Sequence, residues 1–289
     1  MNLGFPSKKT IKTFTLATLV LTAIATTLRT FCLAFGYDYL SEGVGYYTRG
    51  ALSTVFHVVC LVAVLFFLFA AFVSKKGIEC SDGKEENLLL KVACVFVMLG
   101  FAAFFAGTIN STEFVNVSVA FDLLIKISSL MSIACFAVNI FGGEARKLAQ
   151  VVLGFGTVVW LIAILAITYF DIYVPMNSPD KVHLHFALLA LIVFLVSEYR
   201  SFLIKINIPV YIFTLFATVF FSCVETVPSL IKYFALGMAE YDYLYYDIVI
   251  FTLFLYTLTR LLSFAFSIDT RKKDELPSVE NFGETETEE

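Results

Sequence analysis

The segment ALSTVFHVVCLVAVLFFLFAAFV, residues 51–73, contains no Asp, Glu, Lys or Arg. At about 1.5 Å per residue, a helix of this length crosses a hydrocarbon core about 30 Å thick. The whole chain is 59% hydrophobic and only 15% charged, whereas a soluble domain is roughly 45–50% apolar. The segment therefore predicts a membrane-spanning helix, and the composition indicates that other spans accompany it.

Seven further apolar runs of similar length follow or precede this one, each bounded by polar residues or by Gly and Pro. The eight predicted spans cover approximately residues 11–35, 51–73, 88–108, 114–141, 148–170, 183–204, 208–236 and 245–267. Little sequence remains between them for a soluble domain. We therefore expect an all-α integral membrane protein, a polytopic bundle of about eight transmembrane helices in residues 1–267.

The basic residues predict the orientation of the bundle. With the N-terminus inside, 13 of the 20 Lys and Arg residues lie in inner segments or at inner span ends, three in outer segments or at an outer span end, and four deeper within spans. Cytoplasmic loops retain such an excess, so both termini are expected in the cytoplasm. The basic residues and apolar stretch at the start resemble a cleaved signal, but apolarity continues to residue 35, and we expect an uncleaved first helix. Short loops favour a bacterial cytoplasmic membrane.

The C-terminal segment differs from the rest of the chain. Residues 268–289 hold eight acidic and three basic residues and almost nothing apolar after Leu276. Such a composition predicts a disordered acidic tail, which could engage a cytoplasmic partner. Without this tail the formal charge of −4 disappears, and no basic surface indicates nucleic-acid binding.

Two segments share a local pattern that suggests an internal repeat. Asp122 and Asp247 each follow an aromatic residue and precede three branched aliphatic residues near the outer start of a span. Residues 1–146 and 147–267 could then be two parallel four-helix repeats, an arrangement known in transporters. The alternative is chance similarity between apolar segments that draw on few residue types.

The same Asp122 belongs to a polar stripe inside a predicted span. Ser118, Asp122, Lys126 and Ser129 are spaced four, four and three residues apart, which places them on one helix face. An unpaired charge at the centre of a membrane helix costs at least about 2.5–3.5 kcal/mol, so this face should meet protein or water. Asp122 and Lys126 either form a structural clip or line a polar cavity.

Glu225 is the second ionisable group of interest. It lies three residues before Pro228, which has no N–H and therefore frees the carbonyl of Val224. The sequence offers Lys126, Arg29, a proton or a ligand as partners for Glu225. The alternative is a harmless proline kink with Glu225 at the outer interface. Arg29 and Arg260 lie near span ends, where we expect them to extend to the interface as structural residues.

Histidines and cysteines give no metal pattern. His57, His183 and His185 fall in the outer half, but the last two point to different faces of a helix. The six cysteines are scattered without a CxxC pair, so neither a disulfide framework nor a zinc site is expected. Nucleophile-elbow, HExxH and phosphate-loop patterns are also absent from the sequence. We therefore expect no metal or cofactor and favour a protein that is not an enzyme.

These patterns favour the binding or translocation of a small polar or cationic ligand through an outward-facing cavity. An acidic, tyrosine-rich outer rim agrees with such a ligand. The candidate ligand-binding residues are Asp122, Lys126, Glu225, Asp247 and His57. One alternative is a membrane sensor or assembly factor without catalytic activity, and another is an intramembrane enzyme that modifies lipid.

Overall fold

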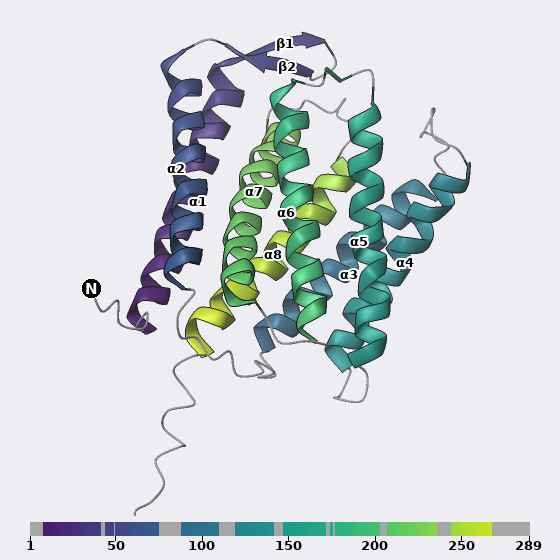
Figure 1. The fold of residues 1–289 in the computed structure, drawn as a ribbon. Coiled ribbons are helices and arrows are strands. Elements are labelled where there is room, and N and C mark those ends of the chain that lie inside the picture. Colours follow the sequence, from purple (N-terminus) through teal and green to yellow (C-terminus); the bar gives the residue numbers. More distant parts are fainter. Residues whose placement is uncertain are drawn as a thin grey trace, which may run out of the picture.

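The protein forms a bundle of eight long helices with one short hairpin (Figure 1). The computed structural model describes residues 8–41, 44–48, 50–74, 88–109, 119–141, 147–171, 174–175, 177–202, 207–235 and 244–267. The helices are α1 (Lys8–Phe35), α2 (Ala51–Val73), α3 (Leu88–Thr108), α4 (Val119–Phe141), α5 (Lys147–Phe170), α6 (Pro179–Ser201), α7 (Ile208–Ala235) and α8 (Leu244–Ser267). The predicted acidic tail, residues 268–289, lies outside the described residues, as does the start of the fourth predicted span at residues 114–118.

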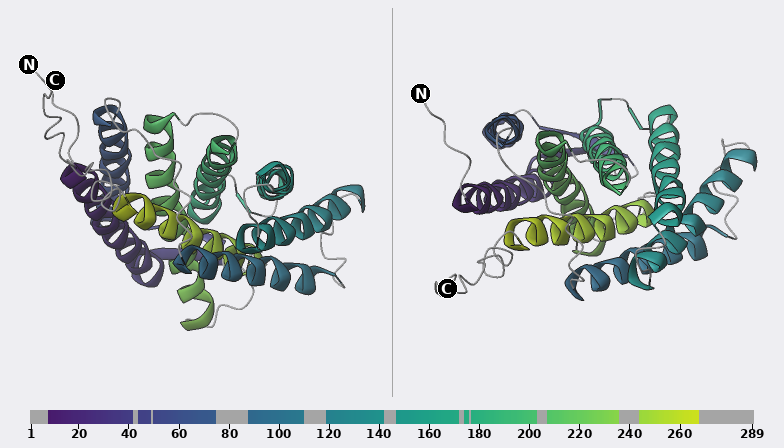
Figure 2. Two further views of the ribbon diagram at one scale, coloured as in Figure 1. Left: turned by 90° about the horizontal axis from the view of Figure 1, so that it is seen from below. Right: turned by 60° about the horizontal axis from the view of Figure 1, so that its bottom comes forward.

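The helices pack in two layers of four. Helices α2, α7, α6 and α5 are neighbours in one layer, and α1, α8, α3 and α4 are neighbours in the other. The view along the bundle in Figure 2 shows the two rows, and Figure 1 shows α8 running obliquely behind α6 and α7. Helix α7 contacts α1, α2, α6 and α8, which makes it the most enclosed element.

All eight helices are long and apolar enough to cross a membrane, so the predicted fold class is confirmed. Their outward faces carry large apolar side chains such as Phe35, Phe72 and Phe234. Such a surface is stable against lipid tails and would be an aggregation hazard in water. A lipid bilayer is therefore the environment of the bundle.

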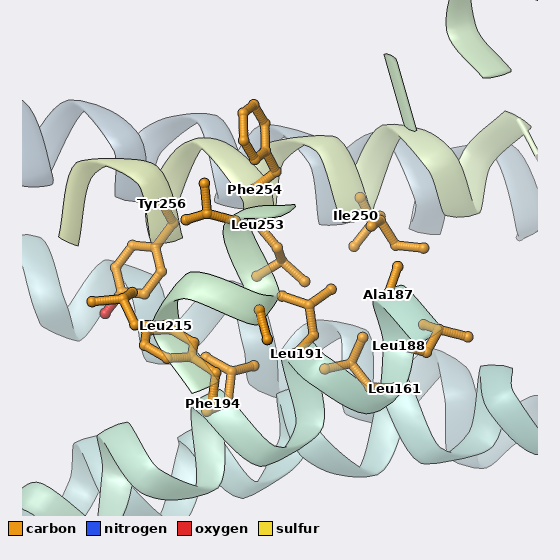
Figure 3. Close-up of a cluster of buried hydrophobic side chains, with 14 of the residues drawn as sticks. Leu161, Ala187, Leu188, Leu191, Phe194, Leu215, Ile250, Leu253, Phe254 and Tyr256 are labelled. Atoms are coloured by element: carbon orange, nitrogen blue, oxygen red, sulfur yellow. The ribbon is translucent and has the colours of Figure 1, made fainter. Parts of the chain in front are cut away.

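The hydrophobic core takes buried side chains from all eight helices, and part of it lies between α5, α6, α7 and α8. Figure 3 shows Leu161, Leu191, Leu215 and Leu253 pointing toward one another from these four helices. Trp160 of α5 packs edge-on against Phe101 and Phe104 of α3, with ring centroids 5.1 Å apart in both pairs. The side chains are packed tightly here, which fixes the positions of the polar groups on the same helices.

A feature that the sequence analysis did not predict is the hairpin of β1 (Tyr37–Ser41) and β2 (Val44–Tyr47). The strands pair antiparallel with Tyr37 opposite Tyr47. The hairpin extends from the ends of α1 and α2 toward α6 (Figure 1). It covers one end of the bundle, which we call the hairpin side.

The start of α6 differs from the prediction in a way that matters for the site. The helix begins at Pro179, four residues before the predicted span, with Ser178 at the N-cap. Pro is favoured in the first turn because its missing N–H would have no helical partner there. This extension brings Asp180 and Lys181 into the helix, where both are buried.

Candidate functional site

A network of buried charges lies on the hairpin side of the bundle. It consists of Arg29 (α1), Tyr37 (β1), Asp180 (α6), Glu225 and Lys232 (α7) and Asp247 (α8), and we call it the hairpin-side cluster. All six side chains are buried. Four helices and the hairpin therefore meet at one set of ionisable groups.

Arg29 holds the centre of this cluster. Its side chain is 0% exposed, so the prediction that it extends to the interface is wrong. The guanidinium pairs with Glu225, which is also 0% exposed, and lies 3.3 Å from Asp180. It also donates to the carbonyl oxygen of Val224 at 2.6 Å. Arginine is suited to this position because its planar fork has donors for several acceptors at once.

Asp180 joins the hairpin to α7. Its Oδ2 accepts a hydrogen bond from the Tyr37 hydroxyl at 2.8 Å and lies 3.4 Å from the Lys232 ammonium. Because Arg29 contacts the other oxygen, this carboxylate has two cationic partners and one neutral donor. The neighbouring Lys181 turns away and donates to the carbonyl oxygens of Asp171 and Val174.

The hairpin is shaped to present Tyr37 to Asp180. A side chain at Gly45 would place its Cβ 2.6 Å from the Tyr37 ring and 2.0 Å from the carbonyl oxygen of Asp38. The Tyr37 hydroxyl also accepts from the Gly45 amide at 3.1 Å. Burial, with the charge of Asp180 beside it, raises the pKa of Tyr37 well above the usual tyrosine value. The hydroxyl therefore keeps its proton and acts as a donor at any physiological pH.

Asp247 is the acid of the cluster that contacts no cationic side chain among the described residues. It is 2% exposed and its Oδ1 makes no hydrogen bond. It interacts electrostatically with Glu225, Arg29, Asp180 and Lys232, so it belongs to the same network. Among the residues that the structure describes, Asp247 forms no ion pair.

Other buried polar atoms near Arg29 also lack hydrogen-bond partners. They include Arg29 Nε, the Tyr47 hydroxyl and His183 Nδ1. Buried polar atoms are normally satisfied by protein, water or ligand, because leaving one unpaired costs about 1–3 kcal/mol. The hairpin side thus offers donors and acceptors to small polar species. Within the described ranges, no three His, Cys, Asp or Glu side chains are close enough to hold a metal ion.

The structure separates the residues that the sequence analysis placed in one cavity. Asp122 and Lys126 pair with each other at 2.7 Å on α4, with side chains 27% and 19% exposed. Helix α4 packs against α3 and α5, whereas Glu225 lies on α7 in the other layer. The expectation of a cavity shared by Asp122, Lys126 and Glu225 is therefore not met, because their helices belong to different parts of the bundle.

His57 lies beside the hairpin and outside the cluster. Its side chain is exposed on α2, and its Nδ1 donates to the Ser53 carbonyl at 2.6 Å. Its ring packs edge-on against Tyr47 and Phe56. Of the five candidate residues, the structure brings Glu225 and Asp247 into the hairpin-side cluster, pairs Asp122 with Lys126 elsewhere and leaves His57 apart.

A second buried network occupies the opposite end of α6, α7 and α8. Glu198 pairs with Arg260 and accepts hydrogen bonds from Tyr211 at 2.8 Å and Tyr256 at 3.4 Å. We call these four residues the far-side cluster. It contains one acid and one base, so its charge is balanced. Arg260 is 18% exposed in its side chain and pairs with Glu198, and its extension to the interface stays a prediction.

Sequence analysis missed three residues of the hairpin-side cluster. None of them was named as a candidate: Asp180 and Tyr37 lie outside the predicted spans, and Lys232 lies near the end of the span predicted at residues 208–236. The Ser178-Pro179 pair was a usable signal for Asp180, because it predicts a helix start just before the acid. No local signal joins Arg29 to Glu225, which are 196 positions apart. Comparison with protein-family models, curated proteins and solved structures finds no match to this chain.

Proposed function

We propose that this protein is a transporter that binds a small cation, a proton included, at the hairpin-side cluster. The observation that carries the proposal is the charge of the cluster: Asp180, Glu225 and Asp247 are three acids, whereas Arg29 and Lys232 are two bases. An uncompensated carboxylate inside a protein costs several kcal/mol. A bound cation would remove that cost.

The position of the cluster favours transport over a purely structural role. Ionisable groups within membrane helices commonly mark ion pathways or proton relays. Glu225 and Asp247 lie on neighbouring helices, and the hairpin is attached to the same cluster through the hydrogen bond from Tyr37 to Asp180. The far-side cluster on the same helices is balanced in charge, as expected of a structural ion pair.

The proposal includes an orientation. The excess of basic residues in alternate loops supports cytoplasmic termini and a hairpin on the outer face of a bacterial cytoplasmic membrane. A cation would then enter the cluster from outside, past Tyr37 and Tyr47.

A flux assay in proteoliposomes tests this function. The full chain is reconstituted, gradients of sodium, potassium or protons are imposed in turn, and a fluorescent indicator inside the vesicles follows each ion. We expect flux of at least one ion above that of empty vesicles, and loss of this flux in Glu225→Gln. Lys126→Met serves as the matched control because its pair with Asp122 lies outside the cluster. Flux equal to empty vesicles for all three ions, or native flux in Glu225→Gln, would contradict the proposal.

A further inference from the structure

The three acids of the cluster differ in their partners. Glu225 pairs with Arg29, and Asp180 contacts Arg29, Lys232 and Tyr37. Asp247 has the same burial but an Oδ1 without any hydrogen bond. If Asp247 were ionised, its charge would be the one left without a contacting cation in the described network. The carboxyl of Asp247 is therefore the group that most needs neutralisation.

The helices packed on α8 supply no further base in contact with Asp247. Helix α8 packs against α1, α3, α6 and α7. The titratable side chains in their hairpin-side halves are Arg29 and Cys32 of α1, Asp180, Lys181, His183 and His185 of α6, and Cys223, Glu225, Lys232 and Tyr233 of α7. In α3 the charged residue is Lys91, which lies in the first turn at the opposite end. Arg29 and Lys232 already contact Glu225 and Asp180, and Lys181 is held by backbone carbonyls.

A metal cation fits this position poorly. Sodium, potassium and divalent ions take several oxygen ligands, typically six or more for a hard cation such as Ca²⁺. The carboxylates of Asp180 and Glu225 are occupied by cationic side chains, and no trio of potential metal ligands converges among the described residues. A proton requires a single oxygen atom, which Asp247 offers.

We propose that Asp247 carries one exchangeable proton, and that the cation of the proposed transport is therefore a proton. Binding forms an O–H bond on the Asp247 carboxylate. Release breaks this bond and passes the proton to water, leaving the carboxylate ionised. Glu225 of the neighbouring helix α7 interacts electrostatically with Asp247. This inference rests on the proposed function, because it names the ion that the cluster binds.

Infrared difference spectroscopy of the full chain in lipid nanodiscs tests the inference. A neutral carboxylic acid has a carbonyl stretch that a carboxylate lacks. Between acidic and alkaline buffer, the native protein should lose one such band, and Asp247→Asn should lack that band altogether. Asp247→Glu keeps an acid and should show the band at a shifted position. Asp122→Asn is the matched control. Asp122 lies in the first turn of α4, as Asp247 does in α8, but Asp122 is paired with Lys126. The band should therefore remain in Asp122→Asn.

Absence of the band from the native protein, or its persistence in Asp247→Asn, would overturn the inference. Failure of Asp247→Asn to fold would also count against it, because asparagine closely resembles the neutral acid in shape. The flux assay separates this inference from the proposed function. Sodium or potassium flux without the acid band contradicts the proton while transport stands. The band without flux of any ion supports the proton on Asp247 and contradicts transport.

Discussion

Arg29 donates to the carbonyl oxygen of Val224 at 2.6 Å, and this carbonyl is the helical acceptor that Pro228 cannot use. The sequence predicts the free carbonyl, because a proline four residues later removes the N–H. The structure identifies the group that takes its place. The carbonyl group that Pro228 leaves free in α7 thus binds Arg29 of α1, and this contact places Arg29 beside Glu225.

The first prediction concerns this ion pair. Arg29→Met should lower the free energy of unfolding by about 3–5 kcal/mol, because it leaves the buried carboxylate of Glu225 without its partner. Thermal unfolding of the purified full chain in detergent measures the effect. The double variant Arg29→Met with Glu225→Gln should recover a large part of the loss, since it removes both charges.

Lys126→Met is the control for the first prediction. Lys126 pairs with Asp122 on the same helix and both side chains are partly exposed, so its removal should cost less than that of Arg29, whose partner Glu225 is 0% exposed. If Arg29→Met unfolds at the temperature of Lys126→Met, the Arg29–Glu225 pair does not hold the bundle together.

The second prediction concerns the hydrogen bond from Tyr37 to Asp180, which attaches the hairpin to the hairpin-side cluster. Tyr37→Phe removes the donor to Asp180 and should cost about 1–3 kcal/mol, because a buried acceptor loses its hydrogen bond. Amide hydrogen exchange in β1 and β2 should become faster in this variant. Tyr46→Phe is the matched control on the adjacent strand, because the Tyr46 hydroxyl bonds Asn177 at the surface. Equal exchange rates in the two variants would show that the Tyr37–Asp180 bond does not hold the hairpin.

The third prediction is an alkaline loss of stability. Burial raises the pKa values of Tyr37 and Tyr47 above that of the unfolded chain, which is about 10 for tyrosine. The folded state then binds more protons than the unfolded state above this pH, so the stability that these two tyrosines contribute is complete below about pH 10 and falls as the pH rises. Each tyrosine contributes a slope of up to about 1.4 kcal/mol per pH unit. Tyr37→Phe should make the alkaline decline shallower, and an unchanged slope would contradict the buried position of Tyr37.

The fourth prediction concerns orientation. Reporter fusions after Asn177 and after Phe282 should report outside and inside, respectively. The basis is the bias of basic residues toward alternate loops. An outside signal at the second position would reverse the direction in which a cation enters the hairpin-side cluster.

The helices were predictable because the apolar runs have sharp ends. The bounds of α2 and α3 match the prediction at both ends, and α7 and α8 differ by a single residue at one end. Helix α6 was predicted to begin too late, because hydropathy penalises Asp180 and Lys181. These charges are tolerated in the helix since both are satisfied by tertiary contacts. A local pattern cannot reveal such contacts.

The site was predictable only in part. Glu225 and Asp247 stand out as charges in apolar runs, and the structure brings them into one network. Arg29 was one of several partners that the sequence offered for Glu225, and the structure selects it. Asp180 could not be found, because it is distant in sequence and resembles an interfacial residue. Asp122 showed the same local pattern as Asp247, but the structure places it on a half-exposed helix face beside Lys126. The two parallel repeats, residues 1–146 and 147–267, stay a prediction that superposition of the halves would test.

The central claim is that the charge imbalance of the hairpin-side cluster is compensated by a bound cation. The most direct measurement is the thermal unfolding midpoint of the full chain in lipid nanodiscs, recorded against pH and against sodium and potassium at constant ionic strength. The account predicts that, below about pH 10 where tyrosines keep their protons, the native midpoint falls as the pH rises, because loss of the proton leaves a buried carboxylate unpaired. It predicts that this dependence disappears in Asp247→Asn and persists in Glu198→Gln, which alters only the balanced far-side cluster. A native midpoint that is independent of pH and of both salts, or an Asp247→Asn midpoint that varies as the native one does, would contradict it.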